Sequence, residues 1–240
     1  MTMRILIVNK FLYLRGGDCV HSLNLKQLLR NAGHDVCFYA MSYSQNIVCE
    51  ENKYFAEEIS FSAKDLQGKI KAASRIIWGI GVVQNFKKLL EEFQPDVVHL
   101  NNIHSYLSPI VAKLAYQRGV KVIWTLHDYK LICPSYSCLC KGNTCEACFT
   151  DKKHVVLRKC MKNSFPASIL AWGEAMNWNK NKLSLWTNSF ICPSQFMAEK
   201  MQQGGYPASK LQVISNFIGE EQVQYIINTP NPIREEAYAY

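Results

Sequence analysis

The 240-residue chain has 48% hydrophobic and 19% charged residues and a formal net charge of +8. This composition excludes a disordered chain and indicates a globular protein with a core. Its apolar runs are too short to span a bilayer. The N-terminal run is interrupted at Asn9 and Lys10 and lacks a signal-peptide cleavage pattern. We therefore expect a cytoplasmic protein whose ten cysteines are reduced.

The basic residues are spread along the chain rather than gathered in one place. The densest segments, 69–75 and 151–162, lack the interleaved aromatic residues of a base-stacking surface, so nucleic-acid binding is not expected. Charge patterning alone favours solvated helix faces for both segments over a surface for lipid or phosphate.

Strand and helix patterns alternate along the chain. Short β-branched runs predict strands at 4–9, 34–41, 95–100, 120–126, 188–194 and 211–216. Helical spacing predicts helices at 17–33, 63–93, 106–118, 161–185 and 195–203. Gly79 and Gly81 should weaken the longest helix, and Ser194 should cap the last one. The pattern predicts an α/β fold, a Rossmann-like three-layer sandwich with a mostly parallel sheet.

Polar side chains follow several of the predicted strands. His104 and His127 stand in such loops, which share one edge of a parallel sheet where ligands bind. Gly16 and Gly17 precede a helix and could admit a phosphate, although a tight turn explains the pair alone more simply. His99 lies inside a strand and is more simply a hydrogen-bonded core histidine.

Several common site motifs are missing. The sequence has no dinucleotide fingerprint, no phosphate-binding P-loop and no nucleophile elbow, so a nucleotide-dependent dehydrogenase and the usual hydrolases are disfavoured.

Four cysteines have a spacing that suggests a structural zinc site. Cys133, Cys145, Cys148 and Cys160 form the pattern C-x11-C-x2-C-x11-C, whose central C-x2-C is a chelating unit. The long arms match no common zinc finger, so reduced thiols or an adventitious disulfide remain alternatives.

Five segments in order resemble one family. They are "MRILIVNKF" with "RGGDCVHSLNLKQLLRNAGHDV", "QPDVVHLNNIHSYLSP", "WTLHDYKLICP", "ICPSQFMAEKM" and "KLQVISNFI". Together they resemble the N-terminal domain of retaining, family 4 glycosyltransferases with the GT-B fold. The resemblance implies transfer of a sugar from a nucleotide-sugar donor without a catalytic metal.

The resemblance also implies roles for individual residues. Gly16 and Gly17, with Arg15, would lie beside the donor diphosphate, and His127 would lie at the reaction centre. The acceptor and sugar side would be lined by Asn101, Asn102, His104, Asp128 and Ser194.

By the same resemblance, residues 1–228 are an acceptor-side domain. Residues 229–240 would be a linker and the start of a second, nucleotide-sugar-binding domain with an E-x7-E pair. The full enzyme would act on a glycan or lipid-linked acceptor in cell-surface polysaccharide synthesis, with peripheral association at the inner face of the plasma membrane. The chain alone would be inactive.

Two other classes of function stay open. One is a non-catalytic module of the same fold that binds a glycan or a lipid-linked sugar. The other is a zinc-dependent hydrolase that uses His99, His104 and His127, although their spacing matches no known motif.

Overall fold

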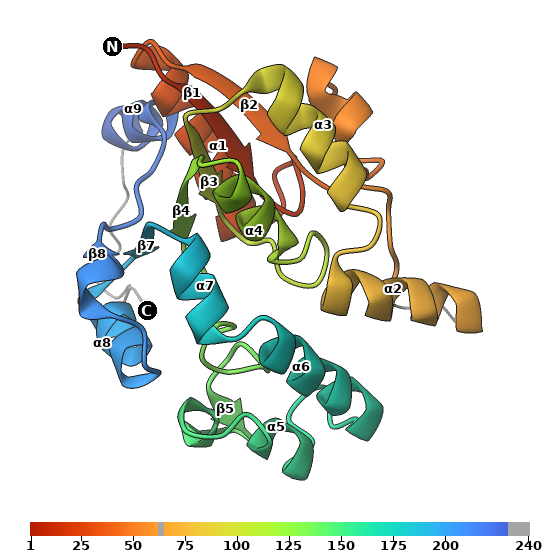
Figure 1. Ribbon diagram of the computed structural model, residues 1–240. Coiled ribbons are helices and arrows are strands. Elements are labelled where there is room, and N and C mark those ends of the chain that lie inside the picture. The colour runs from red at the N-terminus through yellow and green to blue at the C-terminus, as the bar shows by residue number, and fades with distance from the viewer. Residues whose placement is uncertain (62–64, 230–240) are drawn as a thin grey trace.

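A computed structural model of the chain describes residues 1–61 and 65–229 (Figure 1). The strands are β1 (Arg4–Val8), β2 (Asp35–Tyr39), β3 (Val97–Leu100), β4 (Lys121–Thr125), β5 (Leu139–Cys140), β6 (Asn143–Thr144), β7 (Ser189–Cys192) and β8 (Leu211–Val213). The α-helices are α1 (Gly17–Asn31), α2 (Leu66–Trp78), α3 (Val83–Phe93), α4 (Ile110–Gln117), α5 (His154–Leu157), α6 (Phe165–Asn177), α7 (Lys180–Trp186), α8 (Gln195–Gln203) and α9 (Glu220–Asn228).

Six strands form one parallel sheet in the order β2-β1-β3-β4-β7-β8. Strand β2 lies on one side of β1. The chain then crosses back over β1 to β3, and each later strand is added on that other side. Because crossovers between parallel strands are right-handed, α1 covers one face of the sheet, and α3, α4, α7 and α8 cover the other. The three-layer α/β fold predicted from the sequence is confirmed.

The central strands are mostly apolar because helices cover both faces of the sheet. Leu6, Ile7 and Val8 of β1 are fully buried, as are Phe38 and Tyr39 of β2. This rigid core determines where each strand ends, and so it determines the positions of the polar loops that follow the strands.

The predicted helix at 63–93 is two helices, α2 and α3. Gly79 and Gly81 separate them with φ angles of 71° and 82°, values that favour glycine. The buried guanidinium of Arg75 holds this break by donating to the carbonyl oxygens of Ile80 and Tyr106. Residues 62–64 lie outside the described residues.

Other boundaries also differ from the prediction. Helix α4 begins only at Ile110, because Ser105 and Ser108 have positive φ angles and Pro109 precedes the first turn. The helical stretch predicted at 161–185 is α6 and α7, separated where Asn179 caps α7.

The sequence patterns did not predict the β5–β6 hairpin, α5 or α9, nor the short 3-10 helices Glu50–Tyr54, Ala147–Phe149 and Ala208–Lys210. The predicted boundary at 228/229 coincides with the end of α9, and residues 230–240 of the predicted linker lie outside the described residues. No helix in the described part of the chain is long and apolar enough to cross a membrane.

Candidate active site

The candidate site lies where the strand order reverses, between the carboxyl ends of β1 and β3. At such a switch point the neighbouring loops part and leave room for a ligand. Here the two loops are tied at their bases: the amide of Lys10 donates to the Asn102 carbonyl oxygen at 2.9 Å, and the amide of Asn102 donates to the Asn9 side-chain oxygen at 3.1 Å. The fully buried Asn9 therefore fixes the floor of the site.

His127 follows β4 and is oriented by Asn101, which follows β3. Its Nε2 atom lies 3.0 Å from Oδ1 of Asn101. Because an amide oxygen only accepts, Nε2 carries the ring proton and Nδ1 offers a lone pair. The Asn101 carbonyl oxygen is itself held by the indole N–H of Trp124 at 2.9 Å.

Asn101 also offers a free donor. Its side-chain nitrogen is buried and has no hydrogen-bond partner in the described part of the chain. Asn101 and His127 both line a cavity of about 10 Å³. A donor and an acceptor placed side by side are what a sugar hydroxyl, itself both donor and acceptor, can bind.

His127 is kept neutral. Burial, with a smaller contribution from His21, lowers its pKa to about 4. The His21 ring, on α1, lies 5.1 Å from the His127 ring edge-to-face, and 5.3 Å from the Phe217 ring after β8. Burial also lowers the pKa of His21. The pair therefore presents uncharged imidazoles at neutral pH.

The N-terminus of α1 provides the second part of the site. Neither Gly16 nor Gly17 has a positive φ, so backbone strain does not require glycine there. A Cβ atom at Gly17 would meet nothing within 4 Å, and among the described residues the Gly17 amide has no hydrogen-bond partner. An open helix N-terminus with free amides is suited to an anion. Lys10 lies beside it, 3.2 Å from the Asp18 carboxylate.

The loop after β4 is held by a buried ion pair. The Lys130 ammonium lies 2.8 Å from Glu174 of α6 and donates to the Pro134 carbonyl oxygen at 2.7 Å. The Lys130 amide donates to Oδ1 of Asp128 at 2.8 Å. Burial nevertheless raises the pKa of Asp128. Lys130 thus fixes the loop that carries His127 and Asp128.

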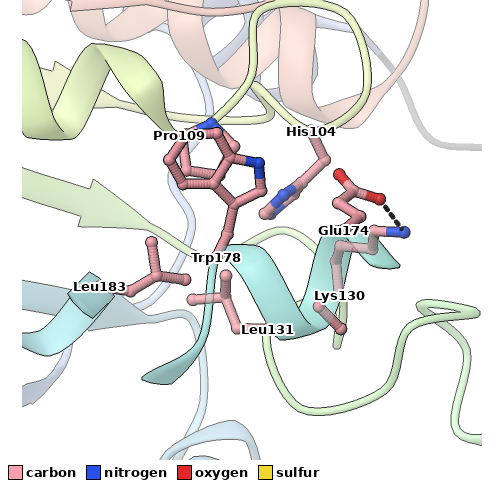
Figure 2. Close-up of a pocket in the computed structure, with 8 residues that line it drawn as sticks. His104, Pro109, Lys130, Leu131, Glu174, Trp178 and Leu183 are labelled. Atoms are coloured by element: carbon pink, nitrogen blue, oxygen red, sulfur yellow. Dashed lines mark ion pairs between the residues drawn. The ribbon is translucent and has the colours of Figure 1, made fainter. Parts of the chain in front are cut away.

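His104 stands between this ion pair and the site (Figure 2). Its ring stacks on Trp124 with centroids 5.4 Å apart, and burial lowers its pKa well below the usual value. Behind it, His104, Lys130 and Glu174 line a cavity of about 20 Å³, room for roughly one water molecule. The carboxylate oxygen Oε1 of Glu174 is buried and has no hydrogen-bond partner in the described residues.

The structure brings most of the predicted site residues to one edge. His127, Asn101, Asn102, His104 and Asp128 surround one small cavity, as expected from their places after β3 and β4.

The other predicted residues lie apart from this cavity. Arg15 is exposed and stacks on Phe11, with its guanidinium carbon 4.8 Å from the ring centre. Ser194 accepts from the Met197 amide at 3.2 Å and caps α8 as predicted, so its role on the sugar side stays a prediction. His99 is a core histidine, as predicted. Its Nε2 lies 2.8 Å from the Thr125 hydroxyl, and burial lowers its pKa to about 3.

The four cysteines of the predicted zinc set lie in one group with Cys138 and Cys140. Cys133 interacts with Cys138 and Cys148. Cys160 Sγ lies 3.8 Å from Cys140 Sγ, and Cys145 Sγ accepts from Arg158. Among residues 1–61 and 65–229, no group of three or more His, Cys, Asp or Glu side chains is arranged to hold a metal ion. Structural zinc on the four cysteines stays a prediction, as does the histidine zinc site of the hydrolase alternative, His99, His104 and His127.

Sequence reasoning missed His21, Lys10, Lys130 and Glu174. His21 stands four residues after Gly17 on the same helix, and that spacing was the available signal for its position at the site. Glu174 had no such signal, because its role depends on where α6 packs.

Comparisons with known proteins identify the family. The family model described as Glycosyltransferase Family 4 matches residues 15–222. The chain belongs to glycosyltransferase family 4. It is 36% identical over 107 residues to an uncharacterized glycosyltransferase of Methanosarcina acetivorans, a match that covers 41% of this chain and 28% of the relative.

Solved structures of similar fold are about twice as long as this chain. The catalytic domain of starch synthase IV from Arabidopsis thaliana, bound to ADP and acarbose, has a TM-score of 0.53 at 12% identity, covering 92% of this chain and 53% of that one. UDP-GlcNAc 2-epimerase from Neisseria meningitidis, bound to UDP-GlcNAc, has a TM-score of 0.46 at 13% identity, covering 89% and 47%. The chain thus spans about half the length of these structures.

Proposed function

We propose that this chain is the acceptor-side domain of a retaining glycosyltransferase that moves a sugar from a nucleotide-sugar donor to a glycan or lipid-linked acceptor. In this proposal the main donor-binding apparatus lies in a second domain, so the 240 residues alone do not catalyse transfer. The acceptor would be an intermediate of polysaccharide synthesis.

The observation that carries the proposal is the hydrogen bond between His127 and Asn101 beside the open N-terminus of α1. In sugar transfer the leaving diphosphate gains negative charge while the sugar ring gains positive character. The free amides of α1 can stabilise the diphosphate charge. A neutral His127 adds no positive charge next to the ring.

His127 and Asn101 would position the sugar rather than exchange protons with it. The Nδ1 lone pair of His127 can accept from a sugar hydroxyl, and the side-chain nitrogen of Asn101 can donate to the same group or its neighbour. The hydrogen bond between His127 and Asn101 orients both side chains before the ligand binds, so binding costs little side-chain conformational entropy.

The proposal can be tested by measuring sugar transfer separately for two polypeptides and comparing them. One is the 240-residue chain, and the other is a longer polypeptide that joins this chain to the second domain of the proposal. We expect transfer, with retention of anomeric configuration by NMR, from the longer polypeptide only. Transfer or nucleotide-sugar hydrolysis by the 240 residues alone would contradict it. Glycan binding by the longer polypeptide without turnover would identify a binding module instead.

A further inference from the structure

Helix α6 shows the reverse of the usual burial pattern. Its buried side chains are small or polar, namely Ser168, Ala171 and Glu174. Four of its large apolar side chains are exposed, namely Phe165 at 51%, Ile169 at 43%, Trp172 at 39% and Met176 at 51%, while Leu170 is half-buried. We call these four exposed residues the α6 stripe.

The α6 stripe forms one continuous face. Its members are spaced at i, i+4, i+7 and i+11, which places them in a row along the helix. Scattered exposed apolar residues are normal on protein surfaces, but a contiguous patch marks an interaction site. The reverse side of the helix is already packed, so the stripe is not a misplaced core face.

Helix α2, which packs against α6, also carries exposed apolar side chains. The two helices meet near their C-terminal ends, where a Cβ on Gly173 would lie 3.4 Å from Ile77 and the Trp178 indole N–H donates to the Ile76 carbonyl oxygen. On α2, Leu66, Ile70 and Trp78 are 72%, 59% and 61% exposed. Figure 1 shows α2, α5 and α6 on the side of the molecule opposite α9.

Basic side chains border the patch. The segment that leads into α6 carries the exposed Arg158, Lys159 and Lys162, and α2 carries the exposed Lys69. None of these four forms an ion pair within the described residues. The only acid on α6 is Glu174, which is buried against Lys130. Positive charge around the apolar surface therefore outweighs the exposed carboxylate of Asp65 at the start of α2.

We propose that the α6 stripe, with Leu66, Ile70 and Trp78 of α2, docks on a membrane surface that contains anionic lipid. Trp, Phe and Ile facing outward beside lysines are the composition of a helix that lies in the headgroup region. The core of a protein–protein interface is instead depleted of lysine. Charge patterning alone favoured solvated faces for 69–75 and 151–162, and the exposed apolar row changes that interpretation. This inference does not rest on sugar transfer.

Vesicle flotation would test the proposal with the 240-residue chain. The probes are vesicles of phosphatidylcholine alone and of equal parts phosphatidylcholine and phosphatidylglycerol. We expect binding to the mixed vesicles that weakens as salt increases. Trp172→Ser should weaken it at least about tenfold, as the loss of one inserted apolar side chain predicts. Lys159→Gln should weaken it about fivefold, on the mixed vesicles only.

A matched control is Leu28→Ser on α1, because Leu28 is 52% exposed on another part of the surface. It should leave flotation unchanged, and circular dichroism should show all variants folded. The proposal fails if the native chain does not float with mixed vesicles, or if Leu28→Ser weakens flotation as much as Trp172→Ser. It also fails if sedimentation velocity shows a dimer that Trp172→Ser dissociates, since a second copy would then cover the stripe.

Discussion

The Nε2 atom of His127 donates to Oδ1 of Asn101 across 3.0 Å, which joins the end of β4 to the end of β3. Nothing in the local sequence around either residue specifies this contact, since they are separated by 26 positions. The parallel sheet creates it by ending the two strands at the same edge. The contact fixes both the ring orientation and the tautomer of His127.

Replacing His127 should reduce catalysis without unfolding the domain. In the longer polypeptide, we expect His127→Ala to lower kcat by about 100-fold or more, as the loss of one preorganised polar group does. Steady-state kinetics would measure it. His34→Ala is the control, because His34 contacts the Met3 amide away from the site. Equal losses in both variants would exclude a special role for His127.

The buried histidines should make the fold sensitive to acid. Folding lowers the pKa of His127 to about 4 and of His99 to about 3, below the usual value of about 6.5. The unfolded chain therefore binds more protons between these values, and stability falls as pH falls below about 6.5, by about 1.4 kcal/mol per pH unit for each such histidine.

Urea unfolding at a series of pH values would measure this loss. His99→Gln can keep a hydrogen bond to Thr125 and should make the pH dependence shallower. A slope that does not respond to His99→Gln would show that another group controls the acid sensitivity.

A substitution at Gly17 should weaken ligand binding without destabilising the fold. A Cβ there meets no atom within 4 Å and the φ angle is ordinary, so Gly17→Ala should keep or raise stability, by up to about 1 kcal/mol. The added methyl group would enter the space open to a diphosphate, so the KM for the nucleotide sugar should rise. Gly204→Ala is the contrasting variant, since its Cβ would collide with Ile132 and should destabilise the domain.

The sequence was enough to predict the sheet and the polar edge. Strand runs such as 4–9 are buried on both faces, and residues directly after them must lie at one edge. His127, Asn101 and His104 were found in this way. Contacts set by helix packing could not be predicted, because they depend on how a distant element docks. Glu174 is the clearest example, since it reaches Lys130 from α6 across a long loop.

The contacts among the cysteines could not be predicted from the sequence either. The C-x2-C spacing identifies Cys145 and Cys148 as a chelating unit, but the fold turns Cys148 toward Cys133 and leaves Cys145 against Arg158. Spacing along the chain does not determine which thiols face one another after the β5–β6 hairpin forms.

The zinc prediction can be tested by elemental analysis of protein purified without chelators. If Cys133, Cys145, Cys148 and Cys160 hold structural zinc, the protein should contain close to one equivalent, the occupancy of a tight structural site, and Cys148→Ser should remove it. Less than about a tenth of an equivalent in the native chain would contradict the prediction.

The Lys130–Glu174 pair should matter far more to stability than the ion pairs on the surface. Both side chains are less than a tenth exposed, and removing one partner leaves the other charge buried and unpaired, at a cost of about 3–5 kcal/mol. We therefore expect Glu174→Leu and Lys130→Met each to destabilise the domain strongly. Combined, they should cost much less than the sum, because no charge is left alone. Denaturant unfolding of the two single variants and the double variant would measure this coupling.

The exposed pair Lys88–Glu92, at 3.9 Å on α3, is the matched control and should couple by less than about 0.5 kcal/mol. Additive losses for Lys130 and Glu174 would show that the two charges are solvated independently. The loop that carries His127 would then be held by the Pro134 and Asp128 contacts of Lys130 alone. Strong coupling would instead make α6 part of the support for the site, since Glu174 is the side chain through which that helix reaches the loop.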